Sequence, residues 1–224
     1  MKKYEFTGET IMYFGRTLHR IRALVKIELD IFKTVEPGEL GGWIEKEENL
    51  SQDGNAWVYG NAWVYGNAWV YGDARVYGDA WVYGDARVYG NAWVYGDAEV
   101  YGNAWVYGDA WVYGDARVCS DARVYGDAEV YGDARVCGDA EVKRRSHLLT
   151  VGPIGSRNGV TTFFRCKDST IKVKCGCFTG TVAEFLEKVE ETHGDNKHAK
   201  AYRLAAELAV AQIKCGEEKE NAED

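Results

Sequence analysis

Apolar and polar positions alternate with a fixed six-residue period from residue 55 to residue 142. The commonest form of the unit is Asn or Asp, then Ala, a variable residue, Val, Tyr and Gly, and the unit occurs fifteen times. Ala and Val are two residues apart and point to one side of an extended segment, while the variable residue and Tyr point to the other. Gly followed by Asn or Asp is typical of turns. Each unit therefore predicts a four-residue strand and a corner, with Ala and Val inside.

A short fixed period is typical of units that stack and cannot fold singly. An aliphatic residue followed four positions later by a small one resembles the hexapeptide pattern of left-handed parallel β-helices. That resemblance implies three hexads per triangular coil and about five coils, with an 18-residue register. Charge pairing alone does not choose this register over a 24-residue one. The 18-residue register stacks Arg75 between Trp57 and Trp93, and it also stacks Arg117 on Arg135.

Outward positions of the repeat carry twelve Tyr and seven Trp. Stacked like side chains stabilise a ladder of strands, so these rings can hold the coils together. They can also form a contact surface for other subunits, because large exposed apolar areas mark interaction sites. We therefore expect a homo-oligomer.

Segments on both sides of the repeat break its period. We predict a mainly β protein with an N-terminal β cap (1–41), a repeat β-helix (42–142), a small α+β module (143–216) and an acidic disordered tail (217–224).

The first part contains strand-like stretches at 3–6 and 10–24, and Ile44 and Leu50 continue the inward phase of Ala56. In the module, strands are predicted at 148–154, 161–167 and 171–178. Thr181 and Glu184 form a capping box that begins a helix. A second helix at 196–214 is predicted to pack through Leu204, Leu208 and Ile213.

The repeat carries a net charge of −8, which equals that of the whole chain. An acidic shaft argues against a nucleic-acid partner. Residues 1–6 lack the apolar run of a signal peptide, and no segment reaches the roughly 20 apolar residues that span a membrane. We therefore expect a cytoplasmic protein with no membrane partner and with reduced cysteines. Cys119 and Cys137 are close in the 18-residue register, but such a compartment disfavours their bond.

The strongest local chemistry is basic. Between residues 143 and 178 there are eight Lys or Arg residues and one acid, Asp168. A Gly-rich loop at 152–159 offers backbone N–H groups, a hydroxyl and a guanidinium, which suit a phosphate or carboxylate. An ordinary hairpin turn is the alternative. The candidate ligand-binding residues are Gly155, Ser156, Arg157, Asn158, Arg165, Lys172 and Lys174.

Cys175 and Cys177 invite a metal hypothesis, with Cys166, His147, His193 and His198 as further ligands. The spacing matches no standard zinc site. Cys175 and Cys177 are spaced two residues apart and share one strand face with Ile171 and Val173, which is typical of buried core thiols. We predict neither a metal, a cofactor nor catalytic residues.

Several features together resemble a group of phage- and prophage-type hexapeptide-repeat proteins. They are the 15–18 and 40–47 segments (Gly-Arg-Thr-Leu and Leu-Gly-Gly-Trp-Ile-Glu-Lys-Glu), the Tyr-Gly-Asp/Asn-Ala run, and the 155–158 and 173–178 segments. The resemblance implies a bacterial host cell as the setting. In a bacterial host cell, we predict a non-catalytic binding protein that sequesters a phosphate-bearing small molecule, such as a host immune signal nucleotide. The alternatives are a self-assembling structural solenoid and an acyltransferase, although no hexad contains the His that such transferases use as a base.

Overall fold

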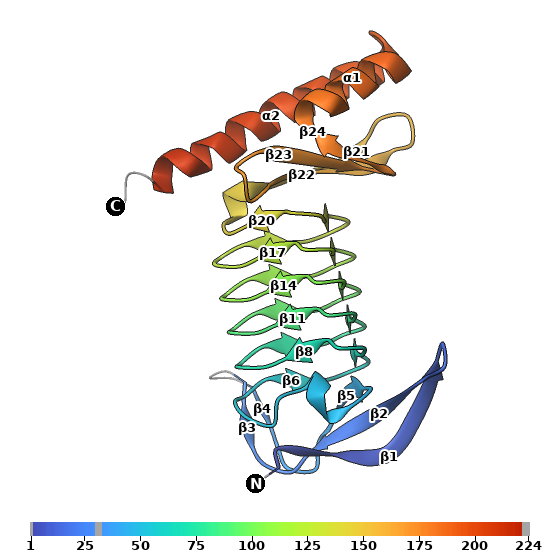
Figure 1. Cartoon of the computed structure of the whole chain (residues 1–224), viewed down its shortest axis with the longest axis vertical. Helices are drawn as coiled ribbons and strands as arrows, with labels where there is room; N and C mark the ends of the chain where they lie inside the picture. Colours follow the sequence, from blue (N-terminus) through green and yellow to red (C-terminus); the bar gives the residue numbers. More distant parts are fainter. Residues whose placement is uncertain (1, 30–32, 221–224) are drawn as a thin grey trace.

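The hexads form a stack of short strands in the computed structural model, which describes residues 2–29 and 33–220 (Figure 1). Each strand contains the variable residue and the Val of one hexad, so it is shorter than the four residues predicted. The remaining residues of the hexad make the corner. The fifteen strands are β6 Trp57–Val58, β7 Trp63–Val64, β8 Trp69–Val70, β9 Arg75–Val76, β10 Trp81–Val82, β11 Arg87–Val88, β12 Trp93–Val94, β13 Glu99–Val100, β14 Trp105–Val106, β15 Trp111–Val112, β16 Arg117–Val118, β17 Arg123–Val124, β18 Glu129–Val130, β19 Arg135–Val136 and β20 Glu141–Val142.

Strands eighteen residues apart pair in parallel and build three sheets, one on each face of the shaft. Trp81, for example, lies opposite Trp63 on one side and Glu99 on the other. We name the faces by their strands: face A holds β7, β10, β13, β16 and β19; face B holds β8, β11, β14, β17 and β20; face C holds β6, β9, β12, β15 and β18. This pairing confirms three hexads per coil and excludes the 24-residue alternative.

The interior of the coils is filled by the Ala and Val side chains, each at most 1% exposed. The corners stack closely as well. At Gly84, whose φ is +74°, an added Cβ would lie 3.0 Å from the backbone nitrogen of Gly102 in the next coil. A Cβ would be strained by that φ and crowded by that contact, which favours Gly at the corner, although Ser120 takes the same position with φ +60°.

The outward aromatic residues form ladders along the shaft. The rings of Tyr65 and Tyr83 are stacked with centroids 5.0 Å apart, and Tyr89 and Tyr107 are stacked at 4.9 Å. Arg75 lies over the ring of Trp93 at 4.6 Å, as the 18-residue register predicts. These rings therefore hold successive coils together.

The N-terminal segment covers the first end of the shaft. Strands β1 (Tyr4–Tyr13) and β2 (Arg16–Ala23) form an antiparallel hairpin that projects beside the shaft (Figure 1). The hairpin continues through β5 (Leu40–Ile44) into face A, and the short strands β3 (Ile27–Glu28) and β4 (Thr34–Val35) pair with each other. Trp57 is fully buried under this cap, although its place in the hexad predicts an outward side chain.

The first coil is irregular. Ile44 and Leu50 are buried as predicted, but they pair with Val64 and Val70, twenty residues further on. They therefore occupy the Val position of the hexad rather than the predicted Ala position. A one-turn helix, η1 (Glu47–Asn49), precedes Leu50, and the Asn49 amide donates hydrogen bonds to the carbonyls of Gly66 and Ala68.

The C-terminal module closes the other end of the shaft. After η2 (Arg145–His147), four antiparallel strands form a sheet: β21 Leu148–Ile154, β22 Gly159–Arg165, β23 Ile171–Cys175 and β24 Phe178–Thr181. The sheet lies across the end of the shaft, and α1 (Val182–His193) and α2 (Lys197–Glu220) lie on its far side (Figure 1). Phe164 packs against the shaft core and Phe163 against the helices. The predicted fold class, a β-helix between a β cap and an α+β module, is confirmed.

Three predictions for the module are wrong in detail. Residues 171–178 are not one strand, because Gly176 (φ +58°) and Cys177 form a turn between β23 and β24. In α2, Ile213 is buried, but Leu204 and Leu208 are 57% and 55% exposed. The helix instead packs through small residues, mainly alanines, which let it approach the sheet closely. Residues 217–220, predicted to be disordered, continue α2 because Glu and Lys favour helix; the rest of the predicted tail lies outside the described residues.

The expectation of reduced cysteines throughout is also wrong. Cys119 and Cys137 form a disulfide between successive coils of face A. Both replace the Tyr of their hexads and lie one coil apart, so their Cα atoms are 4.6 Å from each other. That separation lies within the usual range for disulfides.

Candidate anion-binding site

A cavity of about 370 Å³ lies where the C-terminal sheet meets the last coils of the shaft. Three basic side chains from different parts of the chain line it: Arg135 from β19, Arg157 from the β21–β22 turn and Lys174 from β23. Asp133 is the acidic residue in the lining. The fold therefore brings together cations that are up to 39 positions apart in the sequence.

The β21–β22 turn is shaped by residues with positive φ. Gly155 has φ +76° and Asn158 has φ +46°. A Cβ at Gly155 would lie 1.8 Å from the Tyr202 hydroxyl oxygen, so only Gly lets α2 pack this closely against the turn. The turn thereby places Arg157 between the sheet and α2, with its guanidinium next to Gly176.

Lys174 and Arg135 approach the cavity from the sheet and from the shaft. The Lys174 ammonium donates a hydrogen bond to the Thr179 hydroxyl at 2.9 Å. The backbone N–H of Arg135 donates to the Thr162 hydroxyl at 3.1 Å, which fixes β19 against β22. Arg135 stacks on Arg117, whose charge is already neutralised by Glu99 at 3.0 Å. Within the described residues, no carboxylate pairs with Arg135, Arg157 or Lys174.

Tyr202 separates this cavity from a second, mainly apolar pocket of about 260 Å³. Burial raises the pKa of Tyr202 to about 12, although the charge of Arg157 lowers it. The phenol therefore stays protonated at neutral pH and can donate a hydrogen bond. The second pocket shares Arg157, Cys175 and Tyr202 with the cavity and contains Phe178, Phe185 and Val189.

Three of the seven residues predicted from the sequence line the cavity: Arg157, Asn158 and Lys174. Gly155 and Ser156 belong to the same turn but do not line it. Lys172 and Lys174 lie on the side of the sheet that covers the shaft, as the bond of Lys172 to Asp139 shows.

Two predicted residues lie elsewhere. Lys172 forms a salt bridge with Asp139 at 2.6 Å, and this hydrogen bond raises the pKa of the lysine. Arg165 donates a hydrogen bond to the Ser169 hydroxyl at 2.9 Å. Both side chains therefore serve contacts inside the protein.

Sequence reasoning missed Arg135 and Tyr202. The signal for Arg135 was present, since the 18-residue register stacks it on Arg117 and leaves the second arginine without a partner in the ladder. Tyr202 carried no comparable signal, because its contact depends on how α2 crosses the turn.

Three cysteines of the module whose side chains the structure describes are free thiols. Cys166 is buried, and burial raises its pKa to about 12. Cys175 is half-buried and Cys177 is exposed in the turn, so they do not share the core position predicted for both. Among the described residues, no three His, Cys, Asp or Glu side chains form a group that could hold a metal ion. None of the helices described is both long and apolar enough to cross a membrane.

Comparison with known families concerns the shaft. A family model described as the YdcK β-solenoid repeat matches residues 56–72, 68–84, 80–96 and 98–114, about a quarter of the chain. Each match is nearly one coil long. A search of curated proteins found no match. Together with the observed coils, the repeat match identifies the chain as a repeat β-helix protein.

Proposed function

We propose that this protein is a non-catalytic binding protein that captures an anionic small molecule in the cavity at the end of its shaft. The observation that carries the proposal is the convergence of Arg135, Arg157 and Lys174 on one cavity without a carboxylate partner among the described residues. Clustered cations repel one another, and a bound anion removes that repulsion. Arginine also offers paired donors that suit phosphate and carboxylate groups.

The neighbouring pocket suggests what else the ligand carries. Its walls are mainly apolar, with Lys188, Thr192 and His193 as further polar lining residues, and it adjoins the cations through Arg157 and Tyr202. A nucleotide would place its phosphate among the cations and its base against Phe178 and Phe185. This arrangement favours a phosphate-bearing nucleotide over a simple inorganic ion. In the phage setting that the resemblance implies, such binding would sequester a host signal nucleotide.

The proposal is tested by calorimetric titration with pyrophosphate and with cyclic and ADP-ribose-type nucleotides. Arg157→Ala is expected to weaken binding by about 1.5–3 kcal/mol, the usual contribution of a hydrogen bond to a charged group. Arg165→Ala is the matched control, because it removes the same charge from the same module but lies outside the cavity. If no anion binds the unmodified protein, or if both variants lose affinity equally, the proposal is wrong.

Structural self-assembly is the second candidate function. It is favoured by Leu204 and Leu208, which lie on one face of α2 and are left exposed by the described residues. Both ends of the shaft are covered by the cap and the module, so the assembly would be lateral rather than end to end. Binding and assembly are compatible.

A further inference from the structure

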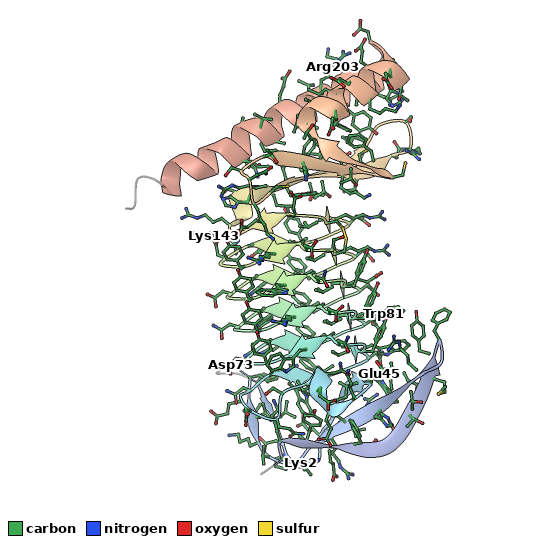
Figure 2. The ribbon with its side chains drawn as sticks, viewed as in Figure 1. Lys2, Glu45, Asp73, Trp81, Lys143 and Arg203 are labelled. Atoms are coloured by element: carbon green, nitrogen blue, oxygen red, sulfur yellow. A yellow bond between two sulfur atoms is a disulfide. The ribbon has the colours of Figure 1, made fainter. Side chains whose placement is uncertain are left out.

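A groove of about 610 Å³ runs along face A beneath the β1–β2 hairpin. Its floor is the ladder of Trp43, Trp63 and Trp81, and Ile11 of the hairpin forms one wall. The rings of Trp63 and Trp81 are parallel, with centroids 5.0 Å apart. Near the hairpin tip, Tyr13 contacts both rings edge to face. Trp81 projects on the side of the shaft toward which the hairpin rises (Figure 2).

Carboxylates from successive coils form the edge of this groove. Asp79, Asp97 and Asp115 occupy the same corner of three consecutive coils and line it. Asn61 donates a hydrogen bond to Asp79 at 3.2 Å. In the described part of the chain, no side chain donates a hydrogen bond to Asp97 or Asp115.

At the other two corners of the same coils, the first position of the hexad is not Asp in every coil but alternates between Asn and Asp. There the amide of one coil donates to the carboxylate of the next, as in Asn91 to Asp109 and Asn103 to Asp121, both at 2.9 Å. At those corners an Asn amide therefore separates the carboxylates of these coils, whereas along the groove the carboxylates of successive coils are direct neighbours.

The groove is therefore negatively charged over an aromatic floor. Its other charged residues, Glu99 and Arg117, neutralise each other at 3.0 Å. Contacts elsewhere on the shaft indicate that its indole rings bind cations. On faces B and C, arginine guanidinium groups lie over indole rings, with Arg87 5.1 Å from Trp105 and Arg75 4.6 Å from Trp93. On face A, Arg20 lies 5.1 Å from the ring of Trp43, whereas no cation of the described residues lies over Trp63 or Trp81.

We propose that this groove binds a linear aliphatic polyamine along the shaft axis. Carboxylates one coil apart are spaced by about 4.8 Å, the distance between paired strands. Amines separated by three or four methylene carbons lie roughly 5–6 Å apart in an extended chain with bonds of about 1.5 Å. The same-side lysines of an extended peptide are about 6.7 Å apart, a poorer match. The methylene segments lie on the Trp floor, and the ammonium groups meet the carboxylates at its edge.

The test is calorimetric titration with spermidine at low ionic strength, where exposed charges are least screened. The variant carries Asp97→Asn and Asp115→Asn. Its matched control carries Asp109→Asn and Asp127→Asn, which remove the same two charges from the same hexad position at another corner. Both are expected to fold, because the chain itself uses Asn at this position in five hexads. We expect the groove variant to bind about tenfold more weakly and the control to change by less than about twofold.

A second variant tests the aromatic floor. Trp81→Arg places a fixed cation in the groove and is expected to abolish spermidine binding, whereas Trp111→Arg on face C leaves it unchanged. Arg157→Ala also leaves it unchanged, because the two sites are separate. The proposal is overturned if spermidine gives no binding, if groove and control variants lose affinity equally, or if an oligo-arginine peptide binds while spermidine does not.

Discussion

At the scale of single residues, the most informative side chain outside the two sites is Lys3. It is 4% exposed and donates a hydrogen bond to the carbonyl oxygen of Ala56 at 2.8 Å, at the covered end of the shaft. Burial lowers its pKa from 10.5 to about 8, although Asp53 and Asp73 oppose the shift. The folded state therefore holds a charged lysine at neutral pH against the cost of removing it from water.

This predicts a specific pH dependence of stability. Between pH 8 and pH 10.5 the unfolded chain retains the Lys3 proton and the folded protein loses it, so the contribution of Lys3 to stability rises with pH. Lys3→Met should lack that rise while keeping the apolar stem. The measurement is denaturant unfolding of both proteins across this range. The difference between their free energies of unfolding removes the contribution of tyrosines, which titrate in both. Parallel pH profiles for the two proteins would contradict the prediction.

Inward and outward positions of the repeat could be predicted residue by residue, because alternation in an extended strand is fixed by backbone geometry. The burial of Trp57 could not, since it depends on a cap whose position the repeat does not encode. The place of Tyr202 in the anion cavity could not be predicted either, because its neighbours come from a module with no periodic signal. Arg135 could have been found, since the 18-residue register stacks it on Arg117 and leaves it without a partner in its ladder.

At the scale of elements, the disulfide joins strands β16 and β19 through the residues that follow them. It closes a loop of 18 residues. In the chain-entropy model a link of that length stabilises the folded state by about 3 kcal/mol. It also anchors the coil that carries Arg135.

Reduction should therefore lower the free energy of unfolding of the unmodified protein. Cys119→Ser combined with Cys137→Ser should show a similar loss without reductant and no further loss with it. Denaturant unfolding with and without dithiothreitol measures both effects. If the unmodified protein has the same stability in both conditions, the disulfide does not form in solution or does not constrain the unfolded chain.

The sequence predicted the fifteen hexad strands, three strands of the module and both helices, but not every other element. The predicted strands at 3–6 and 10–24 are wrong, because the hairpin turn lies at Phe14 and Gly15, between β1 and β2. Strands β3 and β4 were not predicted. The 18-residue register followed from a family resemblance rather than from charge pairing, and the hydrogen-bond ladder confirms it. Strand β24 was missed because the turn before it contains only Gly176 and Cys177, and Cys177 also fits the alternation of the preceding strand. The packing face of α2 was mispredicted because leucine was expected inside, whereas the close contact with the sheet is made by alanines.

At the scale of the whole molecule, charge is divided between an acidic shaft and a basic cavity at its C-terminal end. Self-association remains a prediction. We expect light scattering at micromolar concentration to show an assembly larger than the 25.1 kDa chain. Replacing Leu204 and Leu208 with Glu should shift it toward the monomer, whereas Leu24→Glu, at another exposed apolar residue, should not. A monomer in the unmodified protein would exclude the assembly function and leave the binding function intact.

The proposed binding function requires that the shaft and the module together form an anion-binding cavity. A crystal structure of the protein grown with pyrophosphate tests it most directly. We expect pyrophosphate within hydrogen-bonding distance of the Arg135 and Arg157 guanidinium groups and the Lys174 ammonium. An empty cavity, at a pyrophosphate concentration that saturates binding in calorimetry, would contradict it.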